Sequence, residues 1–167
     1  MDPEALRALQ APLKQAYCDH PKAAHVVARA EAVLDQSALG CIVTTAQGLT
    51  RFAGLHQAAG GDRNAVCAGD MLLEALVACA GTTLAAVATA NGVTLRAARI
   101  TAEGDWDARG TLAADRAVPV GITAIRLHFH IDADIPEALR QRLIATTERY
   151  CVVLQTLRRP PPIVTTA

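Results

Sequence analysis

The chain has 167 residues, of which 51% are hydrophobic and only 3% are aromatic. This length suits a single domain with a core of its own, and the hydrophobic content excludes disorder over most of the chain. The 16 basic and 16 acidic side chains balance, so charge gives no sign of a nucleic-acid or anionic-membrane partner.

Residues 1–23 are predicted to form an N-terminal helical extension. Asp2 suits the N-cap of a helix, Pro3 suits the first helical position, and Glu4 puts a negative charge in the first turn. Pro12 is expected to break or kink this helix. The N-terminus has no basic segment followed by an apolar one, which predicts a cytosolic protein with reduced cysteines.

Three strands are predicted next. Apolar residues alternate with polar ones over residues 25–34, which indicates a half-buried strand. Residues 41–45 and 49–55 follow as two further strands joined by a Gln-Gly turn. Residues 57–64 are polar and rich in glycine, as is typical of a loop.

Residues 70–91 form the most apolar stretch and are predicted to be a long helix that ends at Asn91-Gly92. The stretch is about long enough to cross a bilayer. Glu74 lies inside it, and basic anchors are missing from its immediate flanks. A helix that is apolar on all sides is therefore predicted to lie in the core of a globular protein.

The second half of the chain mixes strand and helix patterns. The predicted elements are a strand over 93–106, a hairpin tip over 107–120, a strand over 125–131, a helix capped by Asp134 that runs to residue 150, and a final edge strand over 163–166. Because strands and helices do not alternate regularly, the order indicates an α+β fold.

Two cysteines stand at the best candidate site. Cys79 lies inside the apolar helix, and Cys151 follows the late helix. Either thiol alone is more simply interpreted as packing, since a free cysteine packs as a small hydrophobe. A reactive thiol needs its thiolate stabilised, for example by a nearby cation. Two thiols that meet in the fold would support redox chemistry.

Three segments carry a resemblance to a known family. Residues 72–84, LLEALVACAGTTL, resemble the cysteine helix of the OsmC/Ohr family, the osmotically inducible and organic hydroperoxide resistance proteins. Residues 151–157, CVVLQTL, resemble the family's second cysteine signature. Residues 50–54, TRFAG, resemble a piece that precedes the cysteine helix in the osmotically inducible branch. The resemblance extends over residues 24–167, which are taken as an OsmC-like domain.

The resemblance implies an intertwined homodimer with antiparallel sheets packed on a long central buried helix. It also implies a thiol peroxidase that reduces organic hydroperoxides. Cys79 would become a sulfenic acid, and Cys151 would condense with it to a disulfide. A dithiol reductant, a lipoylated protein in some members, would restore both thiols. Neither a metal nor an organic cofactor is implied.

The family also holds its first thiolate with an arginine and a glutamate. Arg51 is the predicted arginine, because a fixed cation near Cys79 would lower its pKa, and Arg29 is the alternative. The glutamate position, nine residues before the cysteine, is Asp70 here. Nine residues along a helix rise about 13.5 Å, so Asp70 is expected to brace Arg51 or simply to cap the helix. Val152 replaces the proline that follows the second cysteine.

Other candidates and a rival function stay open. Cys67 is a possible third redox thiol, and His56 a possible proton relay at the loop. His128 and His130 share one strand face, which is better interpreted as a solvated face than as a metal site. The rival is a non-catalytic dimer that binds a small apolar ligand, or a redox-responsive protein without fast peroxidase activity.

Overall fold

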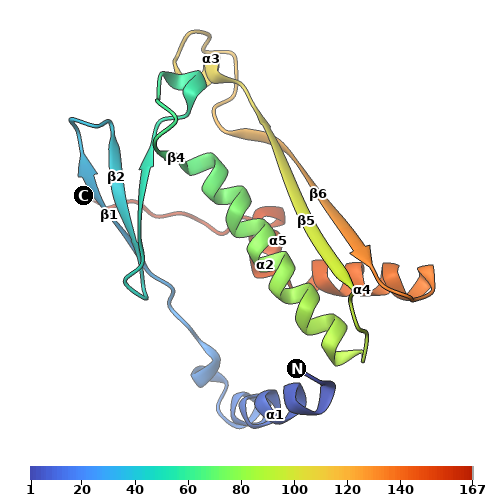
Figure 1. Ribbon diagram of the computed structural model, residues 1–167. Helices are drawn as coiled ribbons and strands as arrows, with labels where there is room; N and C mark the ends of the chain where they lie inside the picture. Colours follow the sequence, from blue (N-terminus) through green and yellow to red (C-terminus); the bar gives the residue numbers. More distant parts are fainter. Residues whose placement is uncertain (167) are drawn as a thin grey trace. The chain divides into compact units, whose positions relative to one another are not determined.

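The computed structural model describes residues 1–166 as two compact units (Figure 1). Unit 1 consists of residues 1–21, 75–102 and 127–166, and unit 2 of residues 22–74 and 103–126. The mixture of helices and two sheets confirms the α+β class.

Unit 2 contains a four-stranded sheet in the order β1-β2-β3-β4. Its strands are β1 (Ala30–Asp35), β2 (Gly40–Thr45), β3 (Thr50–Gly54) and β4 (Val66–Cys67). The first two pairings are antiparallel, as predicted, and the short strand β4 pairs with β3 in parallel. Gly48 supplies the positive φ of 79° in the turn between β2 and β3.

Strand β1 begins later than the alternating sequence predicted. Ala30 pairs with Thr45, the last residue of β2, so the residues before Ala30 have no strand opposite them. A short 3-10 helix, η1 (Pro21–Ala24), precedes this stretch. The predicted half-burial was wrong, because every residue of β1 is exposed. The length of the strand is set by its pairing with β2.

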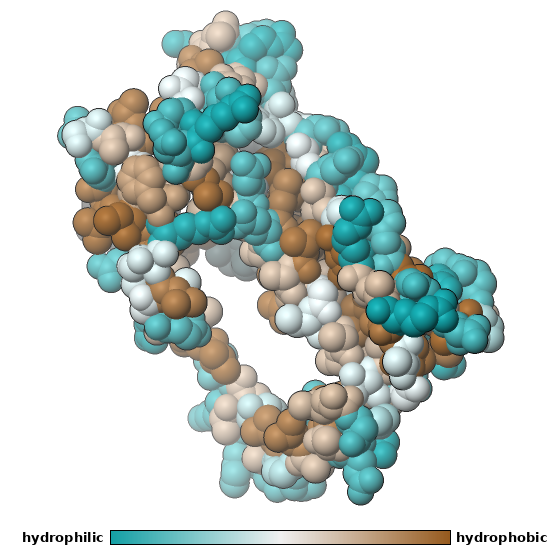
Figure 2. Space-filling view, viewed as in Figure 1, coloured by the Kyte–Doolittle hydropathy of each residue, from teal (hydrophilic) through white to brown (hydrophobic). Residues whose placement is uncertain are grey.

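Apolar side chains remain exposed on this sheet. Val33, Ile42 and Phe52 lie side by side across β1, β2 and β3, and they are 59%, 47% and 37% exposed. Leu34, on the other face of β1, is 81% exposed. The brown surface over β1 and β2 in Figure 2 shows the same property. A contiguous apolar surface of this kind is typical of an interaction site.

The rest of unit 2 holds two short helices, η2 (Gln57–Ala59) and α3 (Ala108–Thr111). Helix α3 lies in the predicted hairpin tip, and the side chain of Asp107 caps it by accepting from the N–H of Arg109 at 2.9 Å.

The core of unit 1 is built around one face of α2 (Ala68–Ala90). Leu76 and Ala80 pack with Cys151 and Leu154, and Leu84 and Val87 pack with Leu143. The partners come from α4 (Glu137–Tyr150) and from α5 (Val152–Arg158) with its N-cap residue Cys151. Ile100 of β5 (Ala97–Trp106) and Phe129 of β6 (Ile122–Asp132) contact both clusters. Figure 1 shows β5 and β6 as a two-stranded ribbon.

Helix α2 is buried less completely than its composition predicted. Within the described chain its buried residues are Leu76, Ala80, Leu84, Val87 and Ala88, which form one face, whereas Leu72 is 39% exposed. Among the described helices α2 alone is long and apolar enough to span a membrane. Because this face forms the core of unit 1, we interpret α2 as a core helix.

Four further predictions at helix and chain ends have clear outcomes. Helix α1 (Pro3–Asp19) is capped by Asp2, which accepts from the N–H of Ala5 at 2.8 Å, as predicted. Pro12 lies inside α1 and does not break it. It removes one backbone hydrogen bond, and strong helix formers on both sides of it maintain the helix. Helix α4 is preceded by Pro136 as N-cap instead of Asp134. Residues 163–166 form no strand, since no described strand pairs with them.

Truncating Leu84 to alanine should destabilise the protein by about 2–5 kcal/mol, because the side chain is only 1% exposed and packs against Leu143. Urea unfolding followed by circular dichroism measures this difference. The control is Leu49→Ala, at a residue that is 70% exposed, for which the free energy of unfolding should change by less than about 0.5 kcal/mol. Equal effects of the two substitutions would contradict this assignment of the core.

Candidate active site

Cys79 and Cys151, which are 72 positions apart in the sequence, lie together in unit 1. Cys79 is a partly buried residue of α2 that packs against the cluster containing the fully buried Cys151. Both cysteines are free thiols. A hydrogen bond from the thiol of Cys151 is one of the causes that lower the pKa of Cys79. The expectation that the two thiols meet is therefore fulfilled within one compact unit.

A break between two helices holds Cys151. Cys151 ends α4, donating its N–H to the carbonyl of Thr147 at 2.9 Å, and begins α5, accepting from the N–H of Gln155 at 2.9 Å. Its ψ of 106° breaks the helical path. No side chain caps α5, so its first N–H groups are available to other acceptors.

The sulfur of Cys79 is such an acceptor. Burial alone would raise its pKa, but hydrogen bonds from the N–H groups of Val153 and Val152 and from the thiol of Cys151 outweigh burial. The pKa of Cys79 therefore lies below the usual value for a thiol. The stabilisation comes from the start of α5, where backbone N–H groups favour negative charge.

The pKa of Cys151 is shifted in the opposite direction. Burial raises it most, the N–H groups of Leu154 and Val153 lower it in part, and the neighbouring Cys79 raises it further. When a pair of interacting thiols loses its first proton, the negative charge resides mainly on the sulfur that its surroundings stabilise better. Cys79 is therefore the thiol of the pair that loses its proton more easily, as its predicted role of nucleophile requires.

We expect Cys79 to react with iodoacetamide with a pH midpoint below that of the same thiol in the urea-unfolded chain, because only the thiolate is alkylated and the folded site lowers its pKa. Peptide mass spectrometry of the alkylated protein across pH measures both midpoints. Cys18, an exposed cysteine of α1, is the internal control for the extent of alkylation. A midpoint for Cys79 that is equal or higher in the folded protein would contradict this assignment.

Arg51, the predicted cation, is held by an ion pair within unit 2. Its two terminal nitrogens bind the two carboxylate oxygens of Glu74, with one Nη2–Oε1 distance of 3.1 Å. Asp70 was expected to brace Arg51, and the structure gives this contact to Glu74 instead. Asp70 lies in the first turn of α2, where its negative charge suits the helix dipole.

Glu74 is the partner of Arg51 that the sequence did not predict, because it was judged only by its helical phase relative to Cys79. Its spacing of 23 positions from Arg51 has no sequence signature. Arg51 belongs to unit 2 and Cys79 to unit 1, so an action of this guanidinium on the thiolate stays a prediction, as does the alternative of Arg29.

Cys67 and His56 line a pocket of about 330 Å³ in unit 2, together with Trp106. The rings of His56 and Trp106 meet edge to face with their centroids 5.0 Å apart. The Nδ1 atom of His56 accepts from the N–H of Ala58 at 3.0 Å, so the imidazole caps η2. His56 therefore has a structural role in this loop, and neither it nor Cys67 belongs to the compact unit of the thiol pair.

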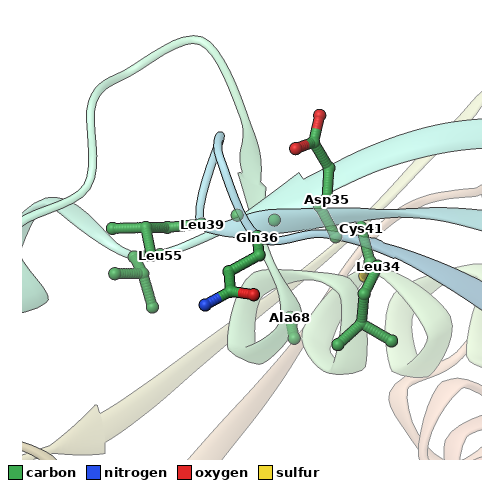
Figure 3. A pocket seen from close by; sticks show the side chains of 10 residues that line it. Leu34, Asp35, Gln36, Leu39, Cys41, Leu55 and Ala68 are labelled. Carbon is green, nitrogen blue, oxygen red and sulfur yellow. The ribbon is translucent and has the colours of Figure 1, made fainter.

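A second pocket of unit 2, of about 490 Å³, opens beside the β1–β2 turn (Figure 3). Leu34, Leu39 and Leu55 give it an apolar lining, and Cys41 contributes a further thiol. Figure 3 shows Leu34 and Asp35 pointing to opposite sides, as expected for successive residues of a strand. Among the described residues no group of three metal-ligating side chains occurs, and His128 and His130 are exposed on β6.

Comparison with known proteins identifies the family. The family model of the OsmC-like proteins matches residues 60–166, which include both thiols of the site. The chain belongs to the OsmC-like protein family. A search of curated proteins found no matching relative.

Solved structures of OsmC-like proteins share the fold at low sequence identity. An OsmC-like protein from Mycoplasma pneumoniae is 18% identical with a TM-score of 0.66, covering 81% of this chain and 89% of its own. An organic hydroperoxide resistance protein from Legionella pneumophila is 20% identical with a TM-score of 0.63, covering 81% and 92%. One from Elizabethkingia anophelis is 16% identical with a TM-score of 0.65, covering 81% and 91%. These likenesses confirm the predicted OsmC-like fold.

Proposed function

We propose that this protein is a thiol-dependent peroxidase that reduces organic hydroperoxides. The observation that carries the proposal is the thiol pair of unit 1, in which Cys79 has a lowered pKa and its neighbour Cys151 a raised one. Low-pKa, partly accessible thiols with a resolving cysteine beside them are typical of redox enzymes. Family membership and the organic hydroperoxide resistance proteins among its structural neighbours give independent support.

The chemistry would proceed in three balanced steps. The thiolate of Cys79 attacks the O–O bond of the hydroperoxide, forming a sulfenic acid and releasing an alcohol once the leaving oxygen takes up a proton. The sulfur of Cys151 then attacks the oxidised sulfur, forming a disulfide and releasing water. A dithiol reductant, such as a lipoylated protein, restores both thiols by exchange and is itself oxidised to a disulfide.

The first turn of α5 would supply most of the electrostatic help in this scheme. Backbone N–H groups from Val152 and Val153 face the reacting sulfur without any reorganisation of the chain. Arg51, held by Glu74, would add a positive charge close to the peroxide. Exposed apolar side chains on unit 2 favour a homodimer that covers them. Five free cysteines suit a reducing compartment such as the cytosol.

The test is a titration of the reduced protein with cumene hydroperoxide. Oxidation should consume two thiols per chain and yield a peptide cross-linked through Cys79 and Cys151, identified by mass spectrometry. Dihydrolipoamide should then reverse the cross-link. A protein that keeps both thiols after prolonged exposure would rule out the peroxidase and leave the rival function, binding of a small apolar ligand.

The rival function has one observation in its favour, the apolar pocket of unit 2 lined by Leu34, Leu39 and Leu55. The residues that line this pocket all belong to unit 2. The test is the fluorescence of an apolar probe added to wild type and to Leu39→Asp. A fluorescence change that occurs with wild type and is lost in Leu39→Asp, while peroxide consumption is unchanged, would support this second role.

Replacing Glu74 with glutamine should lower the peroxidase rate by about tenfold while costing less than about 1 kcal/mol of stability. The small cost follows because both partners of the ion pair are about half exposed, at 48% and 46%. The loss of rate follows because Arg51 would no longer be fixed by two hydrogen bonds. The comparison variant is Arg51→Met, and the double variant should be no slower than Arg51→Met alone. Additive losses would show that Glu74 does not act through Arg51.

A further inference from the structure

One side chain near the thiol pair has an unexplained feature. Thr147 of α4 is 0% exposed, and its hydroxyl is a buried side-chain oxygen with no hydrogen-bond partner in the described chain. Buried hydroxyls are normally paired, because an unpaired one destabilises the folded state. Valine would fill nearly the same volume without this cost, so the hydroxyl itself calls for a function.

Two other threonines, one in α4 and one in α2, have hydroxyls with a hydrogen-bond partner. Thr146 donates to the carbonyl of Arg142 at 2.7 Å, and Thr83 donates to the carbonyl of Cys79 at 2.7 Å. This bond to the carbonyl four residues earlier is the ordinary solution for a helical threonine. Thr147 does not form it with Leu143, so its hydroxyl is left available to another acceptor.

That acceptor is close at hand on the same helix face. Thr147 lies one helical turn before Cys151, and the 2.9 Å hydrogen bond from the N–H of Cys151 to the carbonyl of Thr147 shows that helical geometry continues to Cys151. Side chains four residues apart in a helix are neighbours, with about 5–6 Å between their Cβ atoms. Both side chains are fully buried, so they share the interior of unit 1.

We propose that the hydroxyl of Thr147 donates a hydrogen bond to the sulfur of Cys151 while that sulfur attacks the sulfenic acid of Cys79. This role rests on the proposed peroxidase function and concerns its second step. The S–S bond forms, the S–O bond breaks, and the oxygen leaves as water with the proton from the Cys151 thiol. Negative charge builds on a buried sulfur during this step, and a hydroxyl one turn away can rotate toward it.

The proposal explains why the hydroxyl is unpaired in the reduced protein. In that state Cys151 is a neutral thiol and donates to Cys79, so it offers Thr147 only a weak acceptor. Once Cys79 is oxidised to a neutral sulfenic acid, its own negative charge no longer opposes charge on Cys151. The sulfur of Cys151 then becomes the strongest acceptor near the hydroxyl.

The test separates formation of the sulfenic acid from formation of the disulfide. Wild type, Thr147→Val, Thr147→Ser and Thr146→Val are each mixed rapidly with one equivalent of cumene hydroperoxide and quenched with acid over time. Mass spectrometry follows the disulfide, and dimedone added at intervals traps the remaining sulfenic acid. Thr146→Val is the matched control, because it removes a hydroxyl that already has a carbonyl partner.

We expect Thr147→Val to form the sulfenic acid at the wild-type rate and the disulfide about tenfold more slowly, since a hydrogen bond to a charged acceptor is lost. Thr147→Ser should restore the rate, and Thr146→Val should leave it unchanged. The pH midpoint of disulfide formation should move upward in Thr147→Val only. Thr147→Ala serves as a second variant without the hydroxyl if Thr147→Val fails to fold.

Equal rates of disulfide formation in wild type and both hydroxyl-free variants would overturn the role of Thr147 and leave the peroxidase intact. Absence of the disulfide in wild type would overturn the proposed function, and the role of Thr147 with it. A purely structural role would change the unfolding midpoint without moving the pH midpoint of the resolving step.

Discussion

Replacing Cys79 with serine is expected to reduce consumption of organic hydroperoxide to the rate measured without protein. The reaction needs a sulfur anion, and a serine hydroxyl at the same position stays protonated at neutral pH. The N–H groups of Val152 and Val153 would still point at the site, but they would have no anion to stabilise. Loss of cumene hydroperoxide, followed with dihydrolipoamide as reductant, measures the effect.

The matched control for this variant is Cys67→Ser. Cys67 is also partly buried and precedes the same helix, but it belongs to unit 2, whereas the thiol pair belongs to unit 1. Its replacement should leave the rate of peroxide consumption within about twofold of wild type, as expected for a residue outside the reacting group. Equal, slow consumption by wild type and Cys79→Ser would end the peroxidase proposal. Loss of peroxide consumption in Cys67→Ser but not in Cys79→Ser would show that the nucleophile is Cys67 of unit 2.

Much of the fold was accessible from local patterns. Alternation predicted β6 and most of β5, a long apolar run predicted α2, and Asp2 predicted the start of α1. The wrong predictions concern segments whose structure depends on pairing with another strand. Strand β1 is shortened because β2 ends opposite Ala30, and residues 163–166 are no strand because no described strand pairs with them.

The site was predictable in its sulfurs but not in its surroundings. Cys79 and Cys151 were found because each lies in a distinctive stretch of sequence. The N–H groups that lower the pKa of Cys79 belong to Val152 and Val153, whose side chains carry no sign of this role. The ion pair of Arg51 with Glu74 likewise depends on tertiary structure, since sequence spacing favoured Asp70. Backbone donors and long-range ion pairs leave little trace in a single sequence.

Replacing Cys151 with serine should leave the first oxidation of Cys79 nearly intact while reducing turnover with dihydrolipoamide by about tenfold or more. The serine hydroxyl can still donate to the sulfur of Cys79, so the nucleophile keeps most of the hydrogen bonds that lower its pKa. The sulfenic acid then has no sulfur beside it and must wait for an external thiol. Stopped-flow measurement of peroxide loss and dimedone labelling separate the two steps.

A second variant, Cys151→Ala, tests the hydrogen bond between the two thiols. It removes the donor as well as the resolving sulfur, so the pH midpoint for oxidation of Cys79 should lie higher in Cys151→Ala than in Cys151→Ser. Both variants should accumulate sulfinic acid on Cys79 under excess peroxide, because no disulfide protects the sulfenic acid. If Cys151→Ser instead turns over at the wild-type rate without sulfinic acid, then Cys151 is not the resolving thiol. The only role of Cys151 would in that case be to lower the pKa of Cys79.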